Sequence, residues 1–179
     1  MTETLFPVAA SDVALTSDEW YTPRWLFKAA GITFDLDVCA PVDPLRRNCP
    51  ARAYLTAVDE GLTAAWSGVI WCNPPYSCPA PWVDRFITHT DGLMLVPAAR
   101  SAWRGRLLAA TDTLALIDAT FERPAGVSSF PYAMILAARG STCSNAVERV
   151  AAVDPYAGGA TFVKAETPRS LVTGGQPGL

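Results

Sequence analysis

Short apolar runs recur along the chain and alternate with stretches in which apolar residues follow helical spacing. The run at 68–72 is apolar as in a parallel strand that is buried on both faces, the run at 92–96 is a second buried strand, and the run at 132–137 is a further strand. The expected strands are 32–38, 68–72, 92–96, 113–117, 132–137 and 161–163, and the expected helices are 23–30, 81–88, 101–110 and 145–153. Strands that alternate with helices imply an α/β fold with a mostly parallel sheet flanked by helices.

The first expected helix has recognisable ends. Thr22 is suited to cap it, Pro23 to occupy its first position, and Gly31 to end it. Residues 41–64, by contrast, are rich in Pro, Arg and Asn and show few regular patterns. Ligands of parallel sheets bind beyond the carboxyl ends of the strands, so a site is expected in the segments that begin at Asp37 and Asn73.

The length of 179 residues indicates one domain. We expect a loose arm at 1–17, the domain at 18–166 and a disordered tail at 167–179. The N-terminus lacks a signal-peptide pattern, and no apolar run approaches the ~20 residues of a membrane span. The five cysteines are odd in number and follow no repeated spacing, which favours free thiols in a reducing cytoplasm and argues against zinc.

The formal net charge is −3, whereas nucleic-acid binders usually carry a basic balance. This charge argues against tight, autonomous DNA binding and still allows a local basic face. Two groups of arginines are close in sequence: Arg46, Arg47 and Arg52, and Arg100, Arg104 and Arg106. With one histidine, His89, and no serine-centred elbow, hydrolysis by a catalytic triad is not supported.

The clearest chemistry lies in Asn73-Pro74-Pro75-Tyr76, which directly follows the apolar strand at 68–72. An exocyclic amino group is a poor nucleophile because its lone pair is delocalised into the ring. Two acceptors that hold its hydrogens favour the tetrahedral nitrogen that can attack a sulfonium methyl group. The Asn73 side chain and the Pro74 carbonyl offer such acceptors on a loop that two prolines stiffen. The Tyr76 ring can stack on a flipped base, worth ~1–3 kcal/mol in single-strand binders.

Several ordered blocks surround this loop. They are Asp18-Glu19-Trp20-Tyr21-Thr22-Pro23, Phe34-Asp35-Leu36-Asp37-Val38, Asn48-Cys49 and Trp71-Cys72-Asn73-Pro74-Pro75-Tyr76-Ser77. Together they resemble the phage-type DNA N-6-adenine methyltransferases, over about residues 18–138, and they are more specific than the tetrapeptide alone. The resemblance implies a Rossmann-like fold, S-adenosylmethionine as cofactor, adenine in DNA as substrate and the host-cell cytoplasm as location.

The resemblance also implies roles for single residues. The residues that it matches to cofactor binding are Trp20, Tyr21, Thr22, Pro23, Asp37 and Asp59, and those matched to catalysis are Asn73, Pro74, Pro75 and Tyr76. The chain departs from the family at Pro41, which stands where a glycine-rich turn is expected after the first strand. Glycine permits close backbone approach and positive φ, and proline permits neither.

Three further residues are candidates for substrate binding. Arg100 and Arg104 follow the strand at 92–96, on the expected edge of the site, and can hold phosphates of the target strand. Phe130 precedes another strand and can pack on the target base. Each has a plainer alternative: a solvated helix face for the arginines and core packing for Phe130. For Trp20 the alternatives are a lid over the cofactor and a core anchor.

The sequence therefore predicts a single-domain methyltransferase that acts on adenine in DNA, with no separate target-recognition domain. The same loop chemistry also suits cytosine, RNA adenine or a protein glutamine, because each offers a planar nitrogen of the same kind. For the loop itself the plainer alternative is a strand-ending turn, because Asn and Pro are common in turns. For the whole chain the non-enzymatic alternative is a degenerate methyltransferase fold that only binds a partner, and Pro41 is its best support. The oligomeric state has no signature in the sequence.

Overall fold

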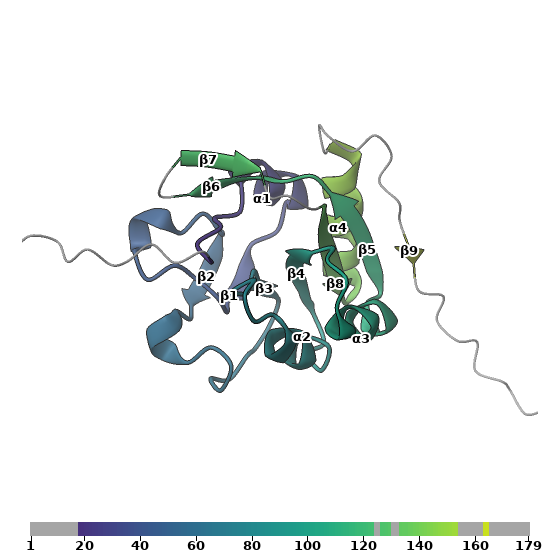
Figure 1. Cartoon of the computed structure of the whole chain (residues 1–179), viewed down its shortest axis with the longest axis horizontal. Coiled ribbons are helices and arrows are strands. Elements are labelled where there is room, and N and C mark those ends of the chain that lie inside the picture. The colour runs from purple at the N-terminus through teal and green to yellow at the C-terminus, as the bar shows by residue number, and fades with distance from the viewer. Residues whose placement is uncertain (1–17, 124–125, 130–132, 154–162, 165–179) are drawn as a thin grey trace, which may run out of the picture.

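The computed structural model describes residues 18–123, 126–129, 133–153 and 163–164. Within this part of the chain, a seven-stranded sheet is covered by helices on both faces (Figure 1). Its strands are β1 (Phe34–Asp37), β2 (Ala51–Tyr54), β3 (Ile70–Cys72), β4 (Gly92–Pro97), β5 (Thr113–Ile117), β8 (Met134–Arg139) and β9 (Val163–Lys164). The helices are α1 (Arg24–Ala30), α2 (Ala80–Phe86), α3 (Ala102–Ala110) and α4 (Ser141–Val153). This is the expected α/β architecture.

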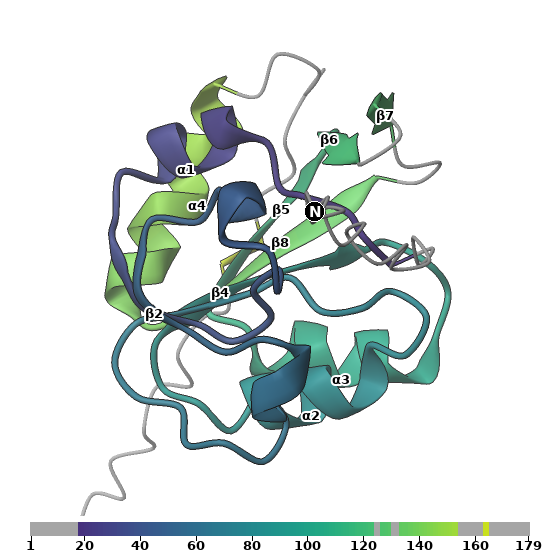
Figure 2. The same cartoon turned by 90° about the vertical axis from the view of Figure 1, so that its left-hand side faces the viewer.

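The two core layers follow from the alternation of side chains along the strands. Helices α1 and α4 pack on one face of the sheet, and α2 and α3 pack on the other (Figure 2). In β3, Trp71 joins the layer under α1 and α4, whereas Ile70 and Cys72 join the layer over α2 and α3. Strands of this kind are apolar on both faces, which is why their sequences read as continuous hydrophobic runs.

The strand order is β2-β1-β3-β4-β8-β5-β9. Strands β2, β1, β3 and β4 pair in parallel, whereas β8 is antiparallel to β4 and β5, and β9 is antiparallel to β5. Strand β8 is reversed because no crossover helix separates it from β5, so the chain re-enters the sheet from the edge where β5 ends. Since β5 keeps the direction of the first four strands, the sheet is mostly parallel, as expected.

The position of the site follows from the path of the chain at β1. Strand β2 is added on one side of β1 and β3 on the other, so β1 and β3 flank a topological switch point. At such a point the loops beyond the carboxyl ends of neighbouring strands turn away from one another and leave a crevice. The loops after β1, β2 and β3 are the ones that bound this crevice.

The sequence did not predict two parts of the fold. Strand β2 lies at the edge of the sheet and has partly exposed residues, so it lacks the apolar run that marks the inner strands. The hairpin of β6 (Thr120–Arg123) and β7 (Gly126–Ser129) pairs outside the main sheet. The predicted arm at 1–17 and tail at 167–179 lie outside the described residues, and no described helix is long and apolar enough to cross a membrane.

The start of α1 also differs from the prediction. Pro23, rather than Thr22, stands at the N-cap, and no side chain caps the helix. The Thr22 hydroxyl instead accepts a hydrogen bond from the Asn73 side chain. Gly31 ends the helix in the left-handed conformation, as expected.

Candidate active site

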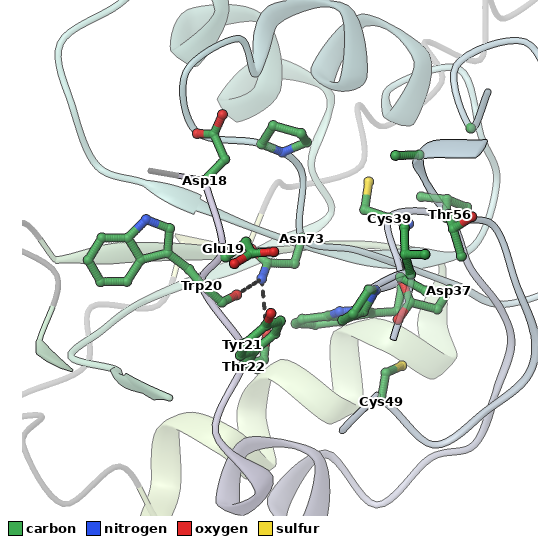
Figure 3. Close-up of a pocket in the computed structure, with 18 of the residues that line it drawn as sticks. Asp18, Glu19, Trp20, Tyr21, Thr22, Asp37, Cys39, Cys49, Thr56 and Asn73 are labelled. Atoms are coloured by element: carbon green, nitrogen blue, oxygen red, sulfur yellow. Dashed lines mark hydrogen bonds between the residues drawn. The ribbon is translucent and has the colours of Figure 1, made fainter. Parts of the chain in front are cut away.

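A cavity of about 570 Å³ opens beyond the carboxyl ends of β1, β2 and β3. It is walled by the segment before α1 and by the three loops that follow these strands. The polar residues among its described lining are Asp18, Glu19, Tyr21, Thr22, Asp37, Arg46, Asn48, Thr56, Glu60, Thr63 and Asn73. Figure 3 shows Asn73 between two ends of this region, with Trp20 on one side and Asp37, Cys49 and Thr56 on the other.

The Asn73 amide is held in one orientation. Its nitrogen donates to the backbone oxygen of Trp20 at 2.8 Å and to the hydroxyl of Thr22 at 3.2 Å (Figure 3). Both amide hydrogens are therefore used, and a flipped amide would place its oxygen against the Trp20 carbonyl. The side-chain oxygen accepts from the Tyr76 hydroxyl at 2.6 Å and keeps a second lone pair.

Tyr76 contributes its hydroxyl to this network and its ring to the core. The ring meets Phe121 edge-on, with centroids 6.3 Å apart. Burial raises the pKa of the phenol well above its ordinary value, so the group stays a donor to Asn73 at physiological pH. Of the four loop residues, Asn73 and Pro75 line the cavity, whereas Tyr76 and the buried Pro74 do not, so base stacking by Tyr76 stays a prediction.

Asp37 is the last residue of β1 and lies in the cavity wall with 3% of its surface exposed. Burial raises the pKa of its carboxyl to about 7. Hydrogen bonds from the Cys39 amide, at 3.1 Å, and from the Cys49 thiol oppose this shift, as does the charge of Arg47. The carboxyl is thus poised between its neutral and ionised forms near neutral pH.

The loop after β1 is organised without a glycine. Arg47 donates from its Nε to the Pro41 carbonyl at 3.0 Å and from a terminal nitrogen to the Val42 carbonyl at 3.2 Å. Its guanidinium also lies over the Tyr54 ring, 4.9 Å from the centroid. A side chain therefore fixes the turn that Pro41 begins, in place of the tight glycine turn expected from the family.

The loop after β2 brings a different acid to the cavity from the one predicted. Asp59 does not line the cavity; its carboxylate accepts from the amide and hydroxyl of Thr56, both at 2.8 Å, in a capping box. The neighbouring Glu60 does line the cavity. A cofactor role for Asp59 thus stays a prediction. The sequence could not show which of the two neighbouring acids lines the cavity. The hydrogen bonds of Asp59 to Thr56 decide it, because they hold the Asp59 carboxylate outside the cavity lining.

Glu19 is a cavity residue that the sequence did not single out. Its Oε2 atom is buried and has no hydrogen-bond partner in the described part of the chain. Figure 3 shows its carboxylate beside Asn73. A buried carboxylate oxygen without a partner is costly, which makes this atom a strong candidate to receive a donor or cation from a ligand.

The other residues of the predicted cofactor segment differ in position. Tyr21 lines the cavity, and the Arg46 guanidinium lies 5.6 Å from its ring centroid. Pro23 is buried at the start of α1 and does not line the cavity. Trp20 borders the cavity, yet its ring points away from the Asp37 end and packs edge-on against Phe121, with centroids 5.7 Å apart.

The three predicted substrate contacts lie outside the cavity lining or outside the described residues. Arg100 is exposed and lies in the loop that follows the carboxyl end of β4. Arg104 donates to the carbonyls of Ala98 and Ala99, at 3.3 and 3.4 Å, and so braces that loop. Phe130 is not among the described residues. Within the described residues, no three His, Cys, Asp or Glu side chains gather to hold a metal ion.

Comparisons with known proteins agree with this geometry. The DNA N-6-adenine-methyltransferase (Dam) family matches residues 11–170 of the chain. The DNA N-6-adenine-methyltransferase of Haemophilus phage HP1 (strain HP1c1) is 41% identical over 78 residues, which are 41% of this chain and 43% of that relative. The match thus covers less than half the length of this relative. No solved structure matches the chain. Since the family match spans most of the sequence, the chain belongs to the DNA N-6-adenine-methyltransferase (Dam) family.

Proposed function

We propose that this chain transfers a methyl group from S-adenosylmethionine to the exocyclic amino group of adenine in DNA. The observation that carries the proposal is the fixed amide of Asn73, which borders a cavity at the switch point of the sheet. Family membership favours adenine in DNA over cytosine, RNA or a protein glutamine as the acceptor. The position of the cavity, beyond the carboxyl ends of β1 and β3, supports a Rossmann-like fold.

The residues around the cavity fit the proposed cofactor. S-adenosylmethionine carries a sulfonium and an ammonium cation, and the acids Glu19, Asp37 and Glu60 line the cavity, besides Asp18, whose carboxylate is bonded to Ser77. The buried, unpartnered oxygen of Glu19 and the buried carboxyl of Asp37 would each gain a donor from a bound cofactor. Arg46 is the cation in the described lining and suits the cofactor carboxylate.

When bound, the cofactor supplies an electrophilic methyl carbon; the chain supplies orientation. One lone pair of the Asn73 side-chain oxygen binds the Tyr76 hydroxyl, and the second can accept an N–H of the target amino group. The Pro74 carbonyl is proposed as the acceptor for the other N–H. Acceptors held on a stiff loop favour the tetrahedral nitrogen at no cost of reorganisation during the reaction.

The experiment that tests this function compares the wild type with Asn73→Ala. DNA incubated with S-adenosylmethionine and the wild type should contain N6-methyladenine when its nucleosides are resolved by mass spectrometry. Asn73→Ala should lose at least about a hundredfold in rate, the usual cost of removing a preorganised hydrogen-bonding group. Its affinity for the cofactor, measured by calorimetry, should change far less.

Asn145→Ala is the matched control, because Asn145 is exposed on α4 and does not line the cavity. It should methylate DNA at the wild-type rate. A wild type that binds no S-adenosylmethionine would favour a non-catalytic binding protein, and methylcytosine or methylated peptides would redirect the acceptor. Full activity of Asn73→Ala would refute the role given to the amide.

A further inference from the structure

Residues 18–22, which we term the strap, run beside the loop 73–77 and are bonded to both of its ends. At the entry of the loop, the Asn73 amide donates to the Trp20 carbonyl and the Thr22 hydroxyl. At its exit, Ser77 donates to the Asp18 carboxylate. Figure 3 shows the strap passing Asn73, with Asp18 above Trp20 and Thr22 below.

The contact at the exit of the loop consists of two hydrogen bonds. The Ser77 amide donates to one oxygen of Asp18 at 2.9 Å, and the Ser77 hydroxyl donates to the other oxygen at 2.6 Å. Hydrogen bonds to an ionised carboxylate are about twice as strong as neutral ones, and two of them define direction as well as distance. Ser77 directly follows Tyr76, so its position sets where the proposed catalytic loop ends.

The strap also belongs to the cavity wall, because all five of its residues line the cavity. A ligand that contacts the strap is thereby linked to the loop through four hydrogen bonds. The Thr22 carbonyl receives a further bond from Asn48, at 3.3 Å, which ties the strap to the segment before β2. The strap is thus fixed on both sides of the cavity.

We infer that Asp18 is a positioning residue, which clamps Ser77 so that the Asn73 and Pro74 acceptors stay aligned for methyl transfer. This inference rests on the proposed function. Asp18 affects the rate of methyl transfer by holding the loop, and both of its carboxylate oxygens already accept hydrogen bonds from Ser77. Its loss should therefore lower kcat while the affinity for S-adenosylmethionine stays nearly the same.

The experiment measures kcat, KM for DNA and the calorimetric Kd for S-adenosylmethionine in four variants. Asp18→Ala and Ser77→Ala should each lower kcat about tenfold, with the cofactor Kd within about threefold of wild type, since a two-bond clamp to a charge is lost. The double variant should be no slower than the slower single variant, because both changes break one contact. Ser77→Thr keeps both donors and should restore most of kcat.

Asp84→Ala is the matched control. Asp84 is also an aspartate that accepts a hydrogen bond of 2.7 Å, from Arg106, yet it lies on α2 and does not line the cavity. This variant should keep the wild-type kcat. If Asp18→Ala is as active as Asp84→Ala, or if cofactor affinity falls as much as kcat, the inference is overturned.

Amide hydrogen exchange separates this inference from the proposed function. Asp18→Ala should speed exchange in the peptide that contains Ser77, and Asp84→Ala should not, whether or not DNA is methylated. A wild type without methyltransferase activity would reject the proposed function and leave this prediction about the clamp in place. Unchanged exchange near Ser77 in Asp18→Ala would show that the clamp does not hold the loop.

Discussion

Asp37 is a buried carboxyl in the cavity wall whose protonation is sensitive to its surroundings. Its carboxyl is 3% exposed, and burial raises its pKa to about 7 from an ordinary value near 3.8. The groups that face it are the Cys39 amide, the Cys49 thiol and the more distant charge of Arg47. These partners stabilise the ionised form less than burial destabilises it, so the carboxyl of the folded protein takes up a proton at a higher pH than an exposed aspartate does.

The pH dependence of unfolding tests this account. Because the folded pKa lies above the unfolded one, the stability that Asp37 contributes is complete below about pH 4 and is lost as the pH rises through about 7. The free energy of unfolding of Asp37→Asn should match that of the wild type near pH 4. At pH 8 it should exceed that of the wild type by at most about 4 kcal/mol. Urea unfolding between pH 4 and 8 measures the difference. Parallel profiles for the two proteins would contradict the raised pKa.

Tyr76 has two roles that variants can separate. Its hydroxyl bonds to Asn73 at 2.6 Å, and its ring packs against Phe121. Tyr76→Phe should keep the ring and lower kcat by up to about tenfold, the equivalent of one hydrogen bond of 0.5–1.5 kcal/mol. Tyr76→Ala should lower kcat further, because the ring contact with Phe121 that holds the loop is lost as well; a fall in DNA affinity would support the base stacking predicted from the sequence. Equal kinetics in the two variants would show that only the hydroxyl matters.

At the scale of elements, the loop after β2 is fitted tightly to the end of β1. A Cβ added to Gly61 would lie 2.5 Å from the Val38 carbonyl oxygen and 2.8 Å from the Trp82 ring. The loop is also tied to α2, because Arg85 donates to the carbonyls of Leu62 and Ala64. The Val38 backbone and the Trp82 ring leave no space for a Cβ atom at position 61. This wall of the cavity therefore requires glycine there.

Two glycine substitutions with opposite effects test this fit. Gly61→Ala should destabilise the fold by about 1–3 kcal/mol through overpacking and should weaken cofactor binding. Gly105 lies inside α3 with open space around its Cα, so Gly105→Ala should stabilise by about 0.5–1 kcal/mol through helix propensity. Thermal unfolding of both variants measures the signs. A stable Gly61→Ala with normal cofactor affinity would exclude the close contact.

At the scale of the whole molecule, a net charge of −3 has to be reconciled with the proposed substrate, DNA, which is a polyanion. Four acids, Asp18, Glu19, Asp37 and Glu60, line the cavity, so part of the negative charge lies there and not on the rest of the surface. Among the arginines near the sheet edge, Arg106 is paired with Asp84 and Arg104 braces its own loop. Arg100 is exposed, and its contact with a phosphate stays a prediction.

Salt dependence measures that contribution. Arg100→Ala should weaken DNA binding and reduce the slope of log K against log salt by about 0.9, the value for one lost phosphate contact. Arg106→Ala removes the same formal charge from an ion pair with Asp84 and should change the slope less. Fluorescence anisotropy with a DNA duplex at several salt concentrations gives both slopes. Identical slopes for Arg100→Ala and the wild type would remove Arg100 from the interface.

The sequence alone determined the inner strands and the position of the Asn73–Tyr76 loop, because both depend only on residues that are close together in the chain. The strand at 113–117 was predicted with the bounds it has, because apolar runs need only their own pattern to be recognised. The Asn73–Tyr76 loop was likewise found at the carboxyl end of a buried strand, where β3 ends at Cys72. Strand β2 was missed because edge strands bury little and carry no apolar run.

Only the tertiary structure decided how distant residues meet. The strap reaches the loop 73–77 across 53 residues at Asn73 and 59 residues at Ser77, a pairing that no local pattern predicts. The same holds for the unpartnered oxygen of Glu19, the choice of Glu60 over Asp59 at the cavity, and the raised pKa of Asp37. Burial and hydrogen-bond partners arise from packing between elements, so these properties exist only once the chain has folded.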